Sequence, residues 1–571
     1  MMSTRLLLRT TYRIQARPWA RNLSSRPSTP QWSYRRLTAI GLSGVVLASS
    51  LAVTSRSTVY ADAEESTQSA AGPTTPLSSF VRSYVVYAMC SIPPLVDWSP
   101  TILSTCLSIP IVKTITESFV RVTFFDQFVG AETAEGAVPL LERFRTENKG
   151  CLFAYSVEVD EAAAAGKAKQ SGKAVQPIHK QIVQEMIHSI DVAADFEDKH
   201  KKGASQRGRR TWVAIKLTAL VPDHHVLTTL SRWLVKERCG RSPIAFPGAP
   251  QPTELDILDR NHSTSSILSQ DDIRMLKDLR DDLDSICQHA SERGVRIIID
   301  AEHSWYQPAI DAFALSLMRK FNRLSASSDN GAVQPLVYNT FQAYLRRNPE
   351  YLAHSLRAAK EGGYALGVKL VRGAYHPHEI QAHTAKLSIS PDSLPPVWPV
   401  KSDTDDCYNA CAEVLLDAIA DDIAHPPASS FFGRWFGSSR HTESTPTVGV
   451  LFGTHNWKSC KLILDGLVKR GLAQVEGVTL DGEPTVRIAD EVTERLTLGQ
   501  LYGMHDNLTE YLVNRTRTTF PCVIKYVPYG SLKEVMPYLS RRAIENKSVL
   551  GEGAAVEERK RAWEGIRARL F

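Results

Sequence analysis

The sequence lacks the motifs of several common kinds of site. Its nine cysteines are scattered, with no CxxC pair, which argues against a cysteine zinc site or a disulfide framework and suits a reducing compartment. Cys407 and Cys411 lie one helical turn apart, a spacing that favours helix packing over metal binding. No HExxH is present and no G-x-G-x-x-G follows a predicted strand, so neither a metalloprotease centre nor a Rossmann dinucleotide site is expected.

Acidic residues are missing from the first 60 positions, which contain nine arginines and no lysine. The rest of the chain carries 58 basic and 61 acidic residues, so this leader produces the net charge of +6. The nearly neutral remainder gives no reason to expect nucleic-acid binding. With 571 residues and 43% hydrophobic content, the chain can hold a barrel-sized core with additional segments.

The leader has the pattern of a targeting segment. Its arginines recur every four residues among large apolar side chains, at Arg5, Arg9, Arg13, Arg17 and Arg21. A basic amphipathic helix without acids predicts a mitochondrial presequence within residues 1–60, and a basic tail is the alternative. Residues 37–53 form a charge-free run of 17 residues, which leaves both a transmembrane segment and a longer targeting region open.

Residues 61–150 are predicted to form a linker and an N-terminal helical arm. The linker, 61–76, is mostly Ser, Thr, Ala and Glu. The apolar segment 83–112 is interrupted by four prolines and Asp97, which argues against one continuous membrane helix. We expect shorter helices that pack on the main domain, with membrane contact as the alternative.

Short apolar runs alternate with longer helical patterns from Leu152 onward. Helices are predicted over 271–293, 349–361, 407–423 and 457–470. Apolar runs that alternate with helices indicate parallel strands covered on both faces. Eight runs predict a (β/α)8 barrel over residues 151–571, although some doubly wound sheets would give a similar count. The runs lie at 152–159, 212–220, 295–300, 333–340, 366–371, 448–453, 496–502 and 521–527.

Four segments between these elements are predicted to be loops, at 161–210, 240–270, 388–404 and 426–446. The first contains an Ala/Gly/Lys stretch and the basic run DKHKKGASQRGRR. We interpret it as a solvated loop.

Polar side chains follow the predicted strands, and in a barrel the carboxyl ends of the strands carry the active site. One buried cation usually belongs to a structural ion pair. Here five strand ends carry charged or amide groups, and structural ion pairs alone do not account for so many polar groups at one place. Unpaired buried ions cost several kcal/mol each. The groups could partly pair with each other, for instance Lys216 with Asp300, and a ligand rich in carbonyl, phosphate or carboxylate groups could bind the rest. The polar residues in or directly after these predicted strands are Lys216, Asp300, Glu302, Gln342, Lys369, Arg372, Thr454, His455 and Asn456.

The stretch YLSRRAIEN, residues 538–546, places Tyr538, Arg541, Arg542 and Glu545 at i, i+3, i+4 and i+7. This spacing aligns the four side chains on one helix face. The face is either solvated or turned toward an anion. The helix could begin at Pro537 or, one turn or more earlier, with a capping box from Ser531 to Glu534.

Seven motifs in this order resemble the proline dehydrogenase family, in its eukaryotic mitochondrial branch: AIKLTAL, IIIDAE, TFQAYL, KLVRGAY, THN, LYGM and YLSRRAIEN. The resemblance runs from about Leu152 to Leu550. It implies an α/β fold, a distorted (β/α)8 TIM-type barrel with FAD across the carboxyl ends of the strands. It also implies oxidation of L-proline to 1-pyrroline-5-carboxylate, the first step of proline catabolism, by hydride transfer from C5 to flavin N5. Ubiquinone is the implied acceptor, at the matrix side of the inner mitochondrial membrane.

The resemblance also implies residue roles. Asp300 and Lys369 would be catalytic, Asp300 by orienting the cationic groups and Lys369 beside the flavin, and Glu545 would keep the paired arginines aimed. The remaining implied substrate contacts are Lys216, Tyr375, Leu501, Tyr526, Tyr538, Arg541 and Arg542. The implied cofactor contacts are Ala301, Gln342, Lys369, Arg372, Gly373, Ala374, Thr454, His455, Asn456 and Glu545. No metal is implied.

Several positions depart from the family pattern. Bacterial members tend to have RLVKGAY, so Lys369 and Arg372 exchange cation types here, and His376 stands where those members often have Trp. Glu158 and Asp160 are both candidates for the carboxylate of the first strand. Tyr526 is bulkier than the residue that hydroxyproline-oxidising relatives tend to have, which favours proline. The rival hypotheses are hydroxyproline oxidation, a methylenetetrahydrofolate reductase-like flavin barrel and a membrane-bound scaffold without catalysis.

Overall fold

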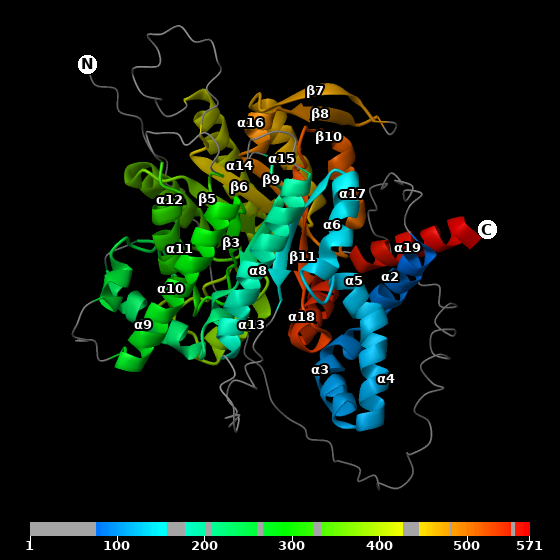
Figure 1. The fold of residues 1–571 in the computed structure, drawn as a ribbon, viewed down its shortest axis with the longest axis horizontal. Coiled ribbons are helices and arrows are strands. Elements are labelled where there is room, and N and C mark those ends of the chain that lie inside the picture. The colour runs from blue at the N-terminus through cyan, green and yellow to red at the C-terminus, as the bar shows by residue number, and fades with distance from the viewer. Residues whose placement is uncertain are drawn as a thin grey trace, which may run out of the picture. The chain divides into compact units, whose positions relative to one another are not determined.

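Eight parallel strands close a barrel in the computed structural model (Figure 1), which describes residues 76–156, 177–200, 208–240, 243–259, 267–324, 333–425, 445–479, 482–549 and 554–570. The order around the barrel is β1-β11-β9-β6-β5-β4-β3-β2, and each neighbouring pair is parallel. All eight predicted strands are confirmed, and the closed barrel replaces the doubly wound alternative. The strands are β1 (Lys149–Tyr155), β2 (Thr211–Ile215), β3 (Ile297–Ile299), β4 (Val337–Gln342), β5 (Leu366–Val371), β6 (Val448–Gly453), β9 (Leu496–Leu501) and β11 (Val523–Tyr529).

Helices surround the barrel and connect successive strands (Figure 1). Three of the predicted helices are confirmed to within one residue at each end, and the fourth, 407–423, begins earlier, at Lys401. A capping box between Ser269 and Asp272 starts α10, and Gly294 in the left-handed region ends it. The helices are α8 (Ile178–Lys199), α9 (His225–Arg238), α10 (Gln270–Arg293), α11 (Gln307–Phe321), α12 (Asn348–Gly362), α13 (His376–Thr384), α14 (Lys401–Ala424), α15 (Trp457–Lys469), α16 (Asp490–Thr493) and α17 (Asp506–Arg515).

The prediction of a solvated loop over 161–210 is wrong for residues 178–199, which form α8. One face of α8 carries buried side chains, among them Ile182, Met186 and Ile190, at helical spacing. The charged residues that suggested a loop lie between these apolar positions. Arg210 in the basic run is also buried, because its guanidinium donates to the carbonyls of Pro521 and Thr493. Residues 161–176 and 201–207 lie outside the described residues.

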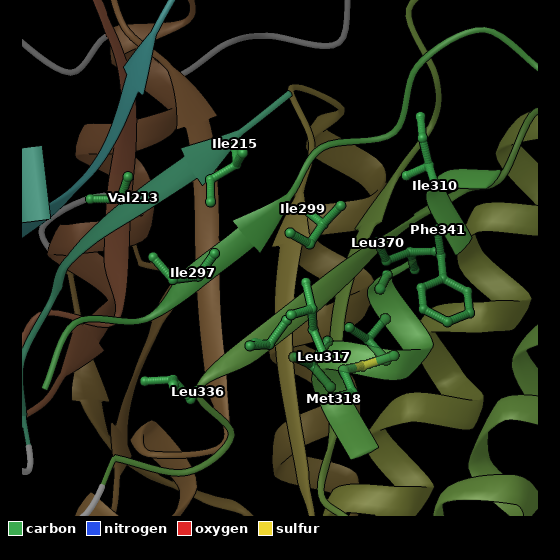
Figure 2. Packing of buried hydrophobic residues seen from close by; sticks show 14 of the residues in the cluster. Val213, Ile215, Ile297, Ile299, Ile310, Leu317, Met318, Leu336, Phe341 and Leu370 are labelled. Atoms are coloured by element: carbon green, nitrogen blue, oxygen red, sulfur yellow. The ribbon is translucent and has the colours of Figure 1, made fainter. Parts of the chain in front are cut away.

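Apolar side chains fill both sides of the barrel wall. Alternate residues of each strand point outward and meet the helices, as Figure 2 shows for Ile297 and Ile299 of β3 opposite Leu317 of α11. The other residues of each strand fill the interior. The inner cluster comprises Leu152, Ala154, Trp212, Ala214, Ile298, Tyr338, Leu451 and Ile524.

A buried ion pair near the amino ends of the strands provides a test of this packing. Asp422 of α14 accepts from Arg495 at 2.7 Å, and both side chains are buried. We expect Asp422→Ala to lower the free energy of unfolding by about 3–5 kcal/mol, because it leaves the Arg495 charge buried without its partner. Urea unfolding at neutral pH measures the change.

Asp417→Ala on the same helix is the matched control. Asp417 is exposed and accepts from Arg470, also at 2.7 Å, so its removal should cost only about 0.2–1 kcal/mol. Equal losses from the two variants would contradict the argument from burial.

A small second sheet that the sequence analysis missed lies outside the barrel. It has the order β10-β8-β7, with β7 (Ala473–Val478), β8 (Pro484–Ile488) and β10 (Thr516–Arg517). Its strands are short and β7 is exposed along most of its length, so they lack the strongly apolar runs of the barrel strands.

The N-terminal arm is helical, as predicted. It comprises α2 (Leu77–Cys90), α3 (Pro93–Ser108), α4 (Pro110–Val120) and α5 (Asp126–Phe128), followed by α6 (Val138–Thr146) before β1. Pro93 and Pro110 stand in the first turns of α3 and α4, so each proline starts a new helix. Among the described residues, no helix is both long and apolar enough to span a bilayer.

The last helices pack on this arm. α18 (Leu532–Val549) shares a buried cluster with it that includes Val96 and Val535, while α19 (Ala554–Leu570) runs along α2. This placement of α18 is the main distortion of the barrel pattern. The helix begins at Leu532, where the Ser531 backbone N–H and hydroxyl both donate to Glu534. The earlier of the two predicted starts is therefore confirmed, with the Glu534 side-chain half of the capping box formed, and Pro537 lies inside the helix.

Candidate active site

The inward-facing side chains change from apolar to polar at the carboxyl ends of the strands. Side chains of a strand alternate between faces, so the inner position after Ala214 is Lys216, and the one after Ile298 is Asp300. On neighbouring strands Lys369 pairs in register with Thr340, two residues before Gln342. The top of the barrel therefore collects the polar residues that the sequence placed at strand ends.

Asp300 joins two residues of this layer. Its Oδ1 accepts from Lys369 Nζ at 2.5 Å, and its Oδ2 accepts from the Tyr526 hydroxyl at 2.8 Å. Lys369 Nζ also lies 4.9 Å from the centre of the Tyr526 ring. The partner of Asp300 is thus Lys369, whereas the sequence analysis had suggested Lys216. Burial, followed by the nearby Asp300 carboxylate, raises the pKa of Tyr526 well above its usual value, so the phenol keeps its proton at neutral pH.

The paired arginines of α18 face this layer and do not extend into solvent. Arg541 Nη1 donates to the Tyr375 hydroxyl at 3.2 Å, and its guanidinium lies 5.3 Å from the Tyr375 ring centre. Arg542 is buried and bonds to Glu545. The positive charge of Arg541 lowers the pKa of Tyr526 in part, against the larger effect of burial. The positive charge of Arg542 likewise lowers the pKa of His455. The helix face predicted from its spacing therefore faces the polar residues at the barrel mouth.

Tyrosine and leucine side chains border the same space. Tyr375 and Tyr538 are buried, and Tyr538 stacks under the Arg542 guanidinium at 5.0 Å. Leu501 neighbours Tyr526 in register and packs against the cluster shared by α18 and the arm. Lys216 follows β2 directly and is half-buried. Aromatic walls, an aliphatic contact and several cations together suit a small molecule with an apolar ring and a carboxylate.

His455 is neutral with a defined tautomer. Its Nε2 accepts from the Leu501 backbone N–H at 3.3 Å, which requires the proton on Nδ1. Burial lowers the pKa of His455 well below its usual value, and the positive charges of Lys525 and Arg542 lower it further. Nδ1 is buried without a hydrogen-bond partner among the described residues. It is therefore a donor available to a ligand.

Arg372 points away from Asp300, toward α14 and α15. Its guanidinium donates to Asp405 and Thr454 at 2.6 Å each and to Ser459 at 2.8 Å. Asn456 caps α15 by accepting from the Ser459 backbone N–H. The two cations of KLVRGAY thus lie in different surroundings, Lys369 inside the barrel and Arg372 at its rim.

The turn after β5 exposes backbone at the rim. Gly373 and Ala374 are both exposed. Gly373 has φ +120°, and a Cβ there would lie 2.3 Å from the Tyr344 ring, so only glycine fits this turn. Ala301, directly after Asp300, is half-exposed on the opposite side of the same strand end.

Sequence reasoning missed two supporting residues, Tyr344 and His303. Tyr344 accepts from Gln342 Nε2 at 3.3 Å. Glu302, which the sequence placed at a strand end, accepts from the Thr218 backbone N–H at 3.1 Å and so holds the turn after Lys216. His303 stacks on Tyr375 with ring centres 4.1 Å apart. His303 follows a predicted strand end directly, which was a usable signal. His376 bonds to the Trp398 carbonyl, and the candidates Glu158 and Asp160 lie outside the described residues.

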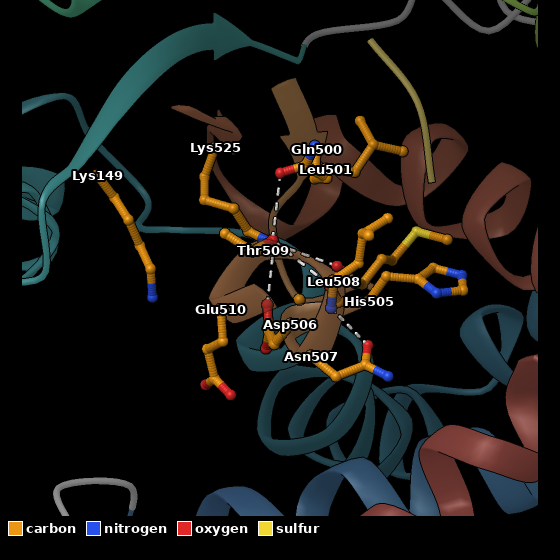
Figure 3. A network of polar contacts seen from close by, with 12 residues as sticks. Lys149, Gln500, Leu501, His505, Asp506, Asn507, Leu508, Thr509, Glu510 and Lys525 are labelled. Carbon is orange, nitrogen blue, oxygen red and sulfur yellow. Dashed lines mark hydrogen bonds and ion pairs between the residues drawn. The ribbon is translucent and has the colours of Figure 1, made fainter. Parts of the chain in front are cut away.

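A polar network surrounds Lys525 and the first turn of α17 (Figure 3). Lys525 Nζ donates to Asp506 at 2.9 Å, to Thr509 at 3.0 Å and to the Met504 carbonyl at 3.1 Å. Burial would raise the pKa of Asp506, but Lys525 and Arg561 outweigh it and lower the pKa to about 2. His505 at the start of α17 lies 5.0 Å from His455, ring centre to ring centre. The network keeps positive charge beside a neutral imidazole.

The residues at the barrel mouth fit a flavin. Besides the His455 Nδ1 donor, Gln342 Oε1 is a buried acceptor without a partner in the described part of the chain. A flavin ring system carries both carbonyl and N–H groups that could bind such a pair. The exposed turn at Gly373 and the Arg372 guanidinium lie at the same rim, where a dinucleotide tail with its phosphates could continue.

Comparison with known proteins identifies a family. A family model described as proline dehydrogenase matches residues 153–554. Proline dehydrogenase 2, mitochondrial, of Arabidopsis thaliana is 29% identical, covering 84% of this chain and 85% of that protein. The probable proline dehydrogenase, mitochondrial, of Schizosaccharomyces pombe is 27% identical over 87% and 89% of the two chains. Hydroxyproline dehydrogenase of Rattus norvegicus is 28% identical over 84% and 89%.

A solved structure was also matched. Proline utilization A of Bdellovibrio bacteriovorus, inactivated by N-propargylglycine, superposes with a TM-score of 0.49 at 17% identity. The match covers 86% of this chain and 39% of that one, so this chain spans about two fifths of that protein.

Proposed function

This chain belongs to the proline dehydrogenase family, and we propose that it oxidises L-proline to 1-pyrroline-5-carboxylate with FAD as its cofactor. Membership makes it an oxidoreductase that acts on proline in proline catabolism. The observation that carries the finer proposal is the arrangement of Arg541 and Arg542 over the buried Asp300–Lys369–Tyr526 group.

The substrate is a zwitterion with a small apolar ring. Arg541 and Arg542, with Lys216, would bind its carboxylate, since planar guanidiniums match a carboxylate with two parallel hydrogen bonds. Tyr375, Tyr538, Leu501 and Tyr526 would enclose the ring. Glu545 holds the Arg542 guanidinium in place. The substrate would therefore be fixed at both ends before reaction.

When bound, FAD would supply the acceptor for a hydride from the ring carbon C5, with a membrane quinone as the proposed final acceptor of the electrons. Gln342, His455, Thr454, Asn456, Ala301 and the turn of Arg372, Gly373 and Ala374 are the residues proposed to bind it. Lys369 places a fixed positive charge at the mouth, where electron density increases during the reaction, and needs no reorganisation to do so. Asp300 fixes the positions of Lys369 and Tyr526.

A hydroxyl on the ring distinguishes the two substrates of the family's relatives. The Tyr526 hydroxyl is already bonded to Asp300, and its ring stands against Lys369. A hydroxyl on the substrate ring would crowd this phenol, which favours proline over hydroxyproline. The comparison is kcat/KM for the two imino acids, and Tyr526→Ser should shift the ratio toward hydroxyproline. A wild-type ratio that favours hydroxyproline would contradict this assignment.

The rate should rise from neutral to mildly alkaline pH. The substrate amine must lose its proton for its lone pair to assist hydride departure, and alkylammonium groups titrate near about 10.4. The pKa of Tyr526 is raised by burial and that of His455 is lowered by burial, so neither group changes its proton in this range. We expect kcat/KM to increase up to about tenfold per pH unit. A flat profile between pH 7 and 9 would disprove the requirement.

Anaerobic reduction tests the proposal as a whole. The purified full chain should be yellow, and L-proline should bleach its flavin absorbance without oxygen. A colourless protein, or a flavin that proline leaves oxidised, would refute the proposal and favour a scaffold without catalysis. A methylenetetrahydrofolate reductase-like enzyme would be bleached by a folate substrate instead.

We further propose that residues 1–60 target the chain to the mitochondrion, that residues 61–150 form the linker and arm, and that residues 151–571 form the FAD-binding barrel. Relatives from a plant and a fission yeast are named mitochondrial. The proposed location is the matrix side of the inner membrane, with ubiquinone as the acceptor and peripheral membrane contact.

A further inference from the structure

Several large exposed apolar side chains of the described surface lie on two neighbouring helices of the arm. On α4 and the turn after it, Ile111, Ile115, Phe119 and Val122 are 78%, 56%, 42% and 59% exposed. Their spacing, i, i+4, i+8 and i+11, places them in one stripe along the helix. Trp98 and Ile102 of α3 are also exposed, one turn apart. Exposed apolar side chains gathered in this way mark an interaction site.

The two helices form a hairpin, defined here as residues 92–120. α3 packs against α4, and Figure 1 shows both extending away from the barrel beyond α18. The hairpin sequence contains three charged residues, Asp97, Lys113 and Glu117. Lys113 and Glu117 form an ion pair at 3.8 Å. Little net charge would have to leave water if this surface were covered.

Most hydroxyl groups of the hairpin donate within it. Those of Ser104, Thr105, Ser108 and Ser118 each donate to a backbone carbonyl three or four residues earlier, at 2.7–2.9 Å. A protein partner could supply acceptors for free hydroxyls, but hydrocarbon cannot. A surface on which most polar groups are already bonded internally loses few hydrogen bonds when it enters lipid.

The size of the surface disfavours a second copy of the chain as its partner. With a rise of about 1.5 Å per residue and a helix width of about 10 Å, the outer face of the hairpin measures roughly 20 Å by 20 Å, or roughly 400 Å². Each partner of a standard protein interface contributes about 800 Å². The hairpin thus offers about half of what a stable dimer needs.

We propose that the α3–α4 hairpin inserts its apolar face into the outer few ångströms of a lipid bilayer and holds the barrel mouth at the membrane surface. Short amphipathic helices lie in this interfacial layer without crossing it. The inner side of the hairpin packs through Val96 and Val120 on α18, the helix that carries Arg541 and Arg542. One element therefore contacts both the bilayer and the substrate end of the barrel, which brings a lipid-dissolved oxidant near the site. That a lipid-dissolved oxidant reacts at this site rests on the proposed function.

Vesicle flotation of the full chain tests the insertion. We expect the wild type to float with neutral phosphatidylcholine vesicles at low and high salt, because hydrocarbon burial is not screened. Ile111→Glu combined with Ile115→Glu should lower the vesicle–buffer partition coefficient at least tenfold. The matched control, Val475→Glu with Val478→Glu, changes two valines of β7 that are 55% and 70% exposed, and it should float like the wild type.

Each other outcome overturns the proposal. Binding that requires cardiolipin and disappears at high salt would assign the contact to headgroup charge. A wild-type dimer in sedimentation, split by the isoleucine substitutions, with no vesicle binding, would assign the surface to a second copy. Equal loss in both glutamate pairs would indicate unspecific damage, which thermal melting checks.

Activity separates this inference from the proposed function. With a water-soluble dye as acceptor, the isoleucine variant should oxidise proline at the wild-type rate, whereas with quinone dissolved in the vesicles its rate should fall at least tenfold. If the wild type oxidises no proline with the dye, the proposed function fails while the flotation result stands. If quinone activity is unchanged in a variant that no longer floats, the insertion does not serve the acceptor and the proposal is wrong in that part.

Discussion

Arg541→Met is expected to lower kcat/KM for proline by about 10²–10⁴-fold, because each charge-assisted hydrogen bond contributes about 1.5–3 kcal/mol and one guanidinium can form two with a carboxylate. In the structure Arg541 is held by the hydroxyl and ring of Tyr375, so little ordering is needed on binding. The loss should be mainly in substrate affinity. Flavin content should remain near that of the wild type, since Arg541 is not among the proposed cofactor contacts.

Arg541→Lys is the matched control for this prediction. Lysine keeps the positive charge but loses the planar fork, so its kcat/KM should lie between those of the wild type and the methionine variant. Steady-state kinetics with proline titration, together with the flavin absorbance of each purified protein, measure both quantities. A methionine variant with kcat/KM within threefold of the wild type would remove Arg541 from the substrate site.

Asp300→Ala should reduce kcat by at least about 100-fold, because it releases both Lys369 and Tyr526 from their fixed positions, and misplacement by about 1 Å can cost this much. It should also lower the free energy of unfolding by about 3–5 kcal/mol, since the Lys369 charge loses its buried partner. The wild-type contacts are 2.5 Å to Lys369 and 2.8 Å to Tyr526. Stopped-flow reduction by proline and urea unfolding give the two values.

Asp259→Ala provides the comparison for Asp300. Asp259 also pairs with a cation, Arg280, at 2.8 Å, but it is largely exposed, so its loss should cost about 0.2–1 kcal/mol and leave kcat unchanged. For Asp300 the decisive readout is a fall in kcat that exceeds any change in KM. If Asp300→Ala only loses stability, with kcat near the wild-type value, the residue has a structural role alone.

The barrel could be predicted because each of its strands is recognisable from the local sequence. Runs such as LGVKLV and VGVLFG are apolar on both faces and short, and each became a strand at the predicted residues. α8 could not be recognised in the same way. Its apolar face, with Ile182 and Met186, is diluted by charged neighbours, and only packing on the barrel shows that this face is buried.

The placement of polar residues at the barrel mouth was predictable where position along a strand decides it. Lys216, Asp300 and Lys369 follow from the two-residue alternation, and the face of Arg541 and Arg542 follows from helical spacing. The partners of these residues were not predictable. Asp300 pairs with Lys369, and Arg372 pairs with Asp405. These pairs depend on contacts between residues far apart in sequence, which no local pattern encodes.

α18 follows all eight barrel strands in the sequence, and this has a consequence for folding. Strands β1 to β11 can assemble before residues 532–549 are available, but the two arginines that complete the mouth arrive after all of them. α19 then seals α2, which lies more than 450 residues earlier in the chain, with Tyr84 and Trp563 in ring contact at 5.8 Å. Such long-range closure is slow. A chain without its last helices would therefore have a closed cylinder of strands but lack both arginines, and under the proposed function it would not bind its substrate until these helices dock.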